Sequence, residues 1–141
     1  MREAQRWIHA SGPLPVDEAW ERYADPDRWS SWAPHLRAVE IEASGEDRRL
    51  HPGLTGVVRG PARVRARFVV ESVDEKARRW SWEVRALGVT LQLLHTLDAS
   101  PEATHAGLVL QGPLPVVLLY RPVARWALRR LVAVSGHPRR G

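Results

Sequence analysis

The sequence contains no cysteine and no asparagine, and Lys76 is its only lysine. The absence of cysteine excludes disulfide bonds, thiolate metal ligands and a cysteine nucleophile. It also favours a reducing compartment, so we expect a cytoplasmic protein. Basic residues number 21 against 16 acidic ones, which gives a net charge of +5. Because nearly all the basic residues are arginine and isoleucine is scarce, the composition is typical of a GC-rich bacterial genome.

The sequence also lacks an apolar run long enough to cross a membrane. Its most apolar stretch, residues 106–120, is interrupted by Gly112, Pro113 and Pro115, whereas a spanning helix takes about 20 apolar residues. The first ten residues carry charges and no apolar core, so no signal peptide is predicted. We therefore expect no membrane insertion.

Several classes of site lack their required pattern. The arginines are spread along the chain and interrupted by acids, whereas a nucleic-acid-binding surface gathers its positive charge or interleaves it with aromatics. The six histidines show no metal-ligand spacing with carboxylates. Neither a glycine-rich phosphate loop nor a nucleophilic-serine motif is present. We predict no nucleic-acid partner, no metal and no cofactor.

The length of 141 residues suits one domain, and no repeat or linker divides it. We expect a single domain over residues 1–141 with a flexible tail at 135–141, which is small, basic and aperiodic. Residues 4–11 predict a first strand. Its inward face is undecided, because Trp7 and His9 compete with Ile8 and Ala10.

Two short helices are predicted after this strand. Residues 15–25 place Pro15 in the first turn of a helix, and Asp25 before Pro26 ends it, because a residue that precedes proline avoids helical angles. Residues 27–34 predict a second short helix or turn, closed by Pro34.

Alternation of apolar and polar residues predicts six further antiparallel strands, near residues 37–43, 51–61, 63–73, 78–87, 89–98 and 103–112. Three of these strands have a clear apolar face. The expected inward residues are Val64, Ala66, Phe68, Val70, Trp80, Trp82, Val84, Val89, Leu91, Leu93, His95 and Leu97. In the last strand Ala106, Leu108 and Leu110 are expected inside.

Residues 113–134 predict one long terminal helix, in which Pro122 forms a kink or a start. The expected inward stripe is Val116, Tyr120, Val123, Ala127, Leu131 and Val134. Arg121, Arg125 and Arg129 are expected on the opposite side. A curved antiparallel sheet can wrap its apolar side around such a helix, and one helix cannot fill the whole concavity. The pattern therefore predicts an α+β protein with a mostly apolar cavity between sheet and helix.

The element order resembles the helix-grip fold of the SRPBCC superfamily. This superfamily includes START-related lipid-binding domains, the birch-pollen allergen group and bacterial polyketide cyclases. The likeness rests on residues 16–34, VDEAWERYADPDRWSSWAP, and on residues 88–114, GVTLQLLHTLDASPEATHAGLVLQGPL. It implies about seven strands around the long C-terminal helix and favours the polyketide cyclase/dehydrase branch. A cystatin-like cone is the competing fold, but it places its helices first and ends on strands.

The resemblance also implies that the two short helices border the cavity. Trp29, Trp32 and His35 would then contact a ligand, with their apolar bodies on the cavity wall. The alternative is that they close the end of the core. The remaining ligand-binding candidates come from inward positions of the predicted elements: Phe68, Trp80, Trp82, Leu91, Leu93 and Val116.

His95 and Tyr120 are the catalytic candidates. His95 is the only ionisable residue on the inward face of its strand, and an apolar cavity would keep its imidazole neutral and able to move a proton. Tyr120 could donate a hydrogen bond to a carbonyl or an enolate. The alternatives are a histidine that is hydrogen-bonded within the core and a packed tyrosine. Arg65 is not included, because its parity places it outside when Phe68 is inside.

Three functions remain open at this point. The first is cyclisation or dehydration of a polyketide-type intermediate in bacterial secondary metabolism, such as antibiotic biosynthesis. The second is a non-catalytic carrier or sensor of a hydrophobic ligand. The third is a basic interaction module that uses Arg121, Arg125 and Arg129. The sequence leaves the ligand, the pocket volume and the choice between monomer and homodimer open.

Overall fold

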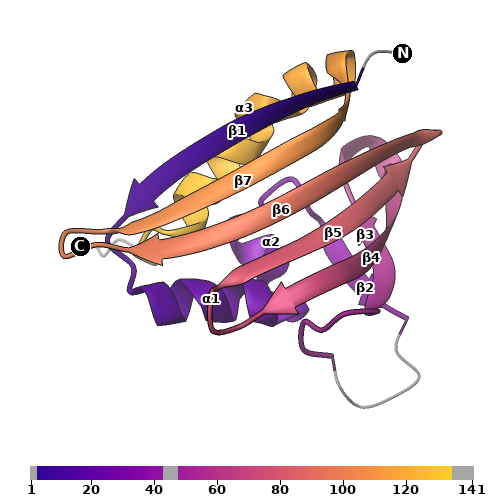
Figure 1. Cartoon of the computed structure of the whole chain (residues 1–141). Coiled ribbons are helices and arrows are strands. Elements are labelled where there is room, and N and C mark those ends of the chain that lie inside the picture. Colours follow the sequence, from indigo (N-terminus) through magenta and orange to yellow (C-terminus); the bar gives the residue numbers. More distant parts are fainter. Residues whose placement is uncertain (1–2, 43–47, 135–141) are drawn as a thin grey trace, which may run out of the picture.

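The computed structural model describes residues 3–42 and 48–134 (Figure 1). The predicted tail at 135–141 lies outside the described residues. The helices are α1 (Val16–Ala24), α2 (Trp29–Trp32) and α3 (Leu114–Leu131), and short 3-10 turns occupy Pro26–Arg28 and Pro61–Arg63. The strands are β1 (Glu3–Gly12), β2 (Ala38–Ile41), β3 (Thr55–Arg59), β4 (Arg65–Asp74), β5 (Arg79–Ala86), β6 (Val89–Ala99) and β7 (Thr104–Pro113).

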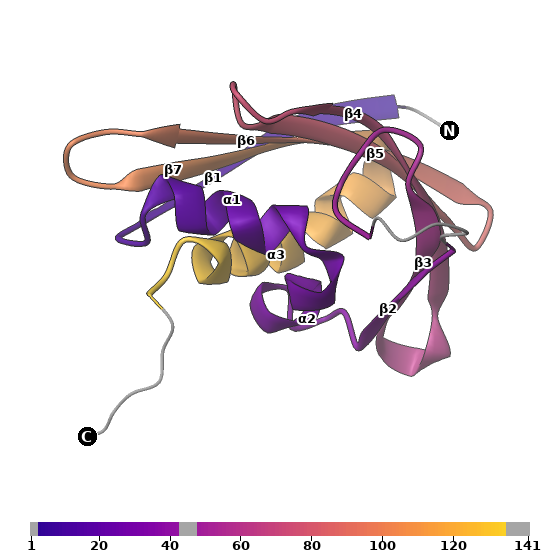
Figure 2. The same cartoon turned by 90° about the horizontal axis from the view of Figure 1, so that it is seen from below.

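The seven strands form one antiparallel sheet in the order β1-β7-β6-β5-β4-β3-β2. Because β1 pairs with β7, the first and last strands of the chain lie side by side. The sheet is strongly curved, and α3 lies on its concave side (Figure 2). The helix packs on β1 and β7. This architecture confirms the predicted helix-grip fold, with its two short helices after the first strand.

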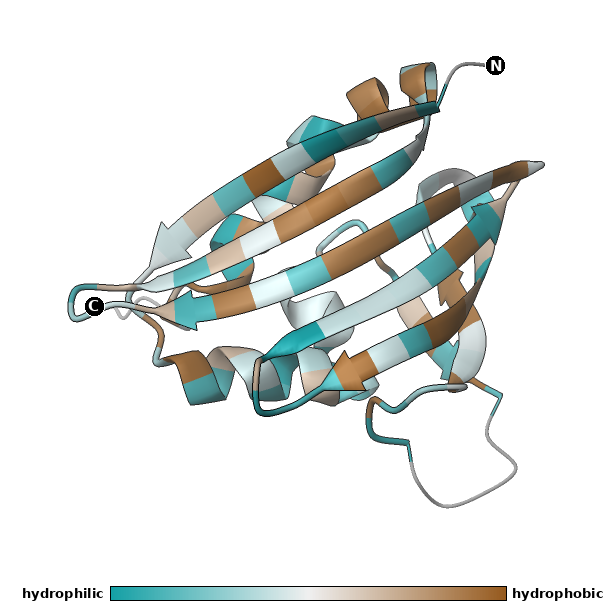
Figure 3. Ribbon diagram, viewed as in Figure 1, coloured by the Kyte–Doolittle hydropathy of each residue, from teal (hydrophilic) through white to brown (hydrophobic). Residues whose placement is uncertain are grey.

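The period-two patterns predicted the inward faces of the strands correctly, and Figure 3 shows the alternation along the ribbon. Ala66, Phe68 and Val70 are buried, whereas Arg65 is exposed. The undecided first strand turns Ile8 and Ala10 inward. Its Trp7 is 54% exposed on the convex face and stacks on His9.

The stripe predicted for the terminal helix is correct in part: Ala127 and Leu131 are buried and Tyr120 and Val123 are partly buried, whereas its two ends differ. The helix is continuous from Leu114 to Leu131 with Pro122 inside it, and its buried residues are Val117, Ala124, Ala127, Leu128 and Leu131. Val134 is 59% exposed and Val116 is only partly buried. The first half of this helix is apolar on all sides, so periodicity could not decide which side faces the sheet.

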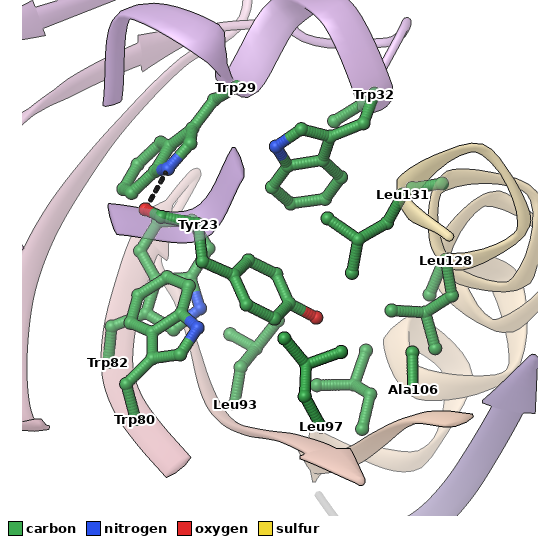
Figure 4. Close-up of a cluster of buried hydrophobic side chains, with 14 of the residues drawn as sticks. Tyr23, Trp29, Trp32, Trp80, Trp82, Leu93, Leu97, Ala106, Leu128 and Leu131 are labelled. Atoms are coloured by element: carbon green, nitrogen blue, oxygen red, sulfur yellow. Dashed lines mark hydrogen bonds between the residues drawn. The ribbon is translucent and has the colours of Figure 1, made fainter. Parts of the chain in front are cut away.

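The tryptophans of α2 have a local structural role. Trp29 donates its indole N–H to the carbonyl of Tyr23 at 2.8 Å, and Trp32 donates to the carbonyl of Arg22 at 3.0 Å. Both carbonyls lie in the last turn of α1, where backbone oxygens have no partner within the helix. The cluster after Asp25 thus caps α1 while its rings join the core (Figure 4).

Candidate functional site

A cavity of about 360 Å³ lies between the concave side of the sheet and α3. Nearly all the side chains that line it are apolar. They are contributed by α2 and the segment after it, by the inner faces of β3 to β7, and by one side of α3. The polar or aromatic lining residues are Trp32, His35, Trp82, His95 and Tyr120.

Seven of the eleven predicted site residues line this cavity: Trp32, His35, Trp82, Leu91, Leu93, His95 and Tyr120. The other four do not. Trp29 packs against Phe68 and Trp80, and all three contact Trp82 in an aromatic cluster of the core. Val116 lies on a different side of α3. In Figure 4, Trp29, Trp80 and Trp82 lie on the side of the view opposite Leu128 and Leu131 of α3, with Tyr23 and Trp32 between them.

His35 and Tyr120 form a polar pair on the cavity wall. Nε2 of His35 lies 2.9 Å from the Tyr120 hydroxyl, although the two residues are 85 positions apart in the sequence. Burial lowers the pKa of His35 below its usual value and raises the pKa of Tyr120 to about 12. Both groups are therefore neutral at pH 7.

The hydrogen bonds of this pair are incomplete. Nδ1 of His35 is buried and has no partner among the described residues. When Tyr120 donates to Nε2, the neutral ring carries its hydrogen on Nδ1, and that hydrogen is unused. When Nε2 donates to Tyr120, the hydroxyl hydrogen is unused. In either arrangement one donor of the pair has no partner among the described residues.

His95 is held differently, because both its ring nitrogens are engaged. Trp82 donates its indole N–H to Nε2 at 3.0 Å, and Nδ1 lies 2.9 Å from the Tyr23 hydroxyl. An indole N–H can only donate, so Nε2 is the acceptor and the neutral ring carries its hydrogen on Nδ1. The ring also stacks on Trp80 with centroids 4.6 Å apart.

Burial lowers the pKa of His95 to about 3. The ring is therefore neutral at physiological pH and has no free lone pair for a proton. This geometry matches the alternative stated for His95, a histidine that is hydrogen-bonded within the core, although its ring edge reaches the cavity wall.

The lining carries no formal charge in the described part of the chain. His35, His95 and Tyr120 are its only ionisable groups, and Arg65 and Arg67 project from the convex side. Among residues 3–42 and 48–134, no three histidine, aspartate or glutamate side chains gather into a possible metal site. The cavity thus has an apolar wall with hydrogen-bonding capacity at one pair.

A family model described as polyketide cyclase/dehydrase and lipid transport matches residues 9–135. The chain belongs to this family. Among solved structures, the crystal structure of Ara h 8.0201 is similar with a TM-score of 0.73 and 12% sequence identity, over 92% of this chain and 95% of that chain. At this identity the likeness shows the fold alone. No curated protein matches the sequence significantly.

Membership of the polyketide cyclase/dehydrase and lipid-transport family agrees with a cavity for hydrophobic ligands. Several lining residues were not among the predicted site residues: Leu36, Val58, Val64, Ala66, Val84, Ala86, Leu108, Val123, Ala124, Ala127 and Leu128. The lining residues on strands could have been identified from the alternating pattern, because they lie on the inward faces of their strands. On α3, the predicted inward stripe contained Val123 and Ala127 but not Ala124 and Leu128.

Proposed function

We propose that the protein binds a mostly apolar, uncharged small molecule in the cavity and holds one acceptor oxygen of that molecule at the His35–Tyr120 pair. The observation that carries this proposal is the single unused donor of the pair in a lining that is otherwise apolar. A buried donor without a partner costs about 1–3 kcal/mol, so a ligand that supplies an acceptor is favoured over its hydrocarbon analogue.

Two neutral probes that differ by one carbonyl group test this proposal, namely naphthalene and 2-acetylnaphthalene. We expect the ketone to bind about 2–10-fold more tightly than the hydrocarbon, the gain from one net hydrogen bond. The double variant His35→Leu/Tyr120→Phe should remove this difference.

Tyr23→Phe is the matched control, because Tyr23 also pairs with a histidine but does not line the cavity. This variant should keep the preference for the ketone. Equal affinities of the wild-type protein for the two probes would contradict the proposed role of the pair.

Catalysis of cyclisation or dehydration of a polyketide-type intermediate is a second candidate function, and Nδ1 of His35 favours it. With Nε2 donating to Tyr120, Nδ1 offers a lone pair and the Tyr120 hydroxyl can donate to a carbonyl oxygen. In a cyclisation, Nδ1 would take a proton from the carbon beside that carbonyl. The resulting enolate carbon would attack a second carbonyl of the same molecule, and the alkoxide formed would recover the proton.

This assignment moves the base from His95 to His35, because both nitrogens of His95 are occupied. Exchange of the methyl protons of 2-acetylnaphthalene in heavy water reports the first step alone. We expect the protein to accelerate this exchange, His35→Gln to abolish the acceleration and His95→Gln to keep it. Binding without accelerated exchange would instead support a carrier or sensor.

A further inference from the structure

The solvent side of α3 carries apolar side chains that nothing in the described chain covers. We define the outer face of α3 as Pro115, Leu118, Leu119, Pro122 and Trp126, which recur at spacings of three and four residues. Leu118 is 45% exposed, Leu119 77% and Trp126 51%, and both prolines are exposed. The first turns of α3 are accordingly coloured brown in Figure 3.

The charged residues of α3 itself are all of one sign. α3 contains Arg121, Arg125, Arg129 and Arg130 and no acidic residue. None of these four arginines forms an ion pair with a residue in 3–42 or 48–134, whereas eight arginines elsewhere do, namely Arg28, Arg48, Arg49, Arg59, Arg67, Arg78, Arg79 and Arg85. The positive charge beside the outer face is thus not compensated within this part of the chain.

This combination disfavours a second copy as the occupant. A two-fold interface brings the same patch of both copies together. The uncompensated arginines of the two α3 helices would then face each other, and like charges at an interface cost free energy.

We propose instead that the outer face of α3 docks on an anionic lipid surface. Tryptophan and leucine on the contact face of a helix, flanked by arginine, are typical of helices that lie in the plane of a membrane interface. Each arginine near an anionic surface adds attraction, and its long side chain can place the guanidinium among the headgroups. No helix in the described residues is long and apolar enough to cross a membrane, and docking in the interface plane requires no crossing.

Docking would place the cavity close to the lipid surface, because α3 contributes to both. Tyr120, Val123 and Ala127 line the cavity from another side of α3. A molecule docked by Leu119 and Trp126 would therefore hold one wall of its cavity beside the lipid. The docking proposal and the ligand-binding proposal can be contradicted independently, because binding of 2-acetylnaphthalene is measured without vesicles.

Flotation with vesicles tests this proposal on the full chain. We expect binding to vesicles that contain about one third phosphatidylglycerol in phosphatidylcholine, weaker binding to phosphatidylcholine alone, and loss of binding as salt is raised. Leu119→Ala/Trp126→Ala should lower the partition coefficient about tenfold or more, since two apolar side chains no longer enter the interface. Trp7→Ala removes an equally exposed tryptophan from the convex face and should change nothing.

A second pair of variants tests whether the arginines of α3 are needed for binding to anionic vesicles. Arg125→Gln/Arg129→Gln should weaken binding to the anionic vesicles about fivefold for each arginine replaced. Arg65→Gln/Arg67→Gln changes two exposed arginines on the convex side of β4 and should have little effect. Equal binding to neutral and anionic vesicles, or binding to neither, would overturn the proposal. So would a concentration-dependent dimer that Leu119→Ala/Trp126→Ala dissociates, since the face would then be an interface between two copies.

Discussion

Trp82 donates its indole N–H to Nε2 of His95 across 3.0 Å, and this bond fixes the tautomer of the histidine. The ring must carry its hydrogen on Nδ1, next to the Tyr23 hydroxyl at 2.9 Å. Three residues from α1, β5 and β6 thus form one buried polar chain. Four predictions follow from this chain and from the cavity beside it.

The first prediction concerns acid stability. The pKa of His95 is about 3 in the folded protein and about 6.5 in an unfolded chain. Between these two values the unfolded chain binds a proton that the folded protein does not, so the free energy of unfolding falls as pH falls. The expected slope from His95 is about 1.4 kcal/mol per pH unit in this window, and His95 adds no slope above it.

Urea denaturation between pH 7 and pH 4 checks this slope. His35 also has a lowered pKa and contributes in the same direction, so the comparison is between the wild-type protein and His95→Gln. Glutamine can still donate to Tyr23 and accept from Trp82, and it does not titrate. Its slope should be shallower than that of the wild-type protein, and identical slopes would show that His95 titrates normally.

The second prediction compares two neighbouring tryptophans of β5. Trp82→Phe leaves Nε2 of His95 buried without a donor, whereas the indole N–H of Trp80 has no partner among the described residues and its loss breaks no bond. Both substitutions remove a similar volume from the core. Trp82→Phe should therefore be more destabilising than Trp80→Phe by about 1–3 kcal/mol. Thermal unfolding of the two variants measures the difference, and a more stable Trp82→Phe would contradict the assigned bond.

The third prediction concerns the pH dependence of ligand binding. Burial lowers the pKa of His35, and a ligand that covers this residue would lower its pKa further. Binding then releases a proton, so affinity for 2-acetylnaphthalene should be constant at neutral pH and fall as pH drops through the pKa of His35. His95 would cause such a fall only near pH 3, because its pKa is about 3. His35→Gln should give a flat profile over the same range, and an unchanged profile would assign the titration to another group.

The strands that follow β1 and their inner faces were predictable from sequence, because period-two alternation is a local property. Phe68, Trp82 and Leu93 were all placed inward correctly. The orientation of α3 was predicted only in part: Ala127 and Leu131 are inside as expected, but Val117 is buried in place of Val116, because the residues around them are apolar on every side. Only packing on β1 and β7 selects the face that is buried.

The pairing of polar side chains depends on distant parts of the chain. His35 and Tyr120 were both predicted as site residues, but their contact joins positions 85 residues apart. His95 meets Tyr23 over a separation of 72 residues. The contact of His95 with Trp82 joins neighbouring strands. β5 and β6 form a hairpin in which Trp82 pairs with Leu93 and Trp80 pairs with His95. A partner for His95 on β5 could have been expected from that register.

The fourth prediction tests whether the space between the sheet and α3 takes up a ligand. Calorimetric titration with 2-acetylnaphthalene should show one saturable site in the wild-type protein. Ala127→Phe, which places a ring in the cavity from α3, should abolish it. Ala99→Phe, at an exposed position of β6, should keep it. Unchanged binding to Ala127→Phe, or no saturable binding to the wild-type protein, would contradict the account.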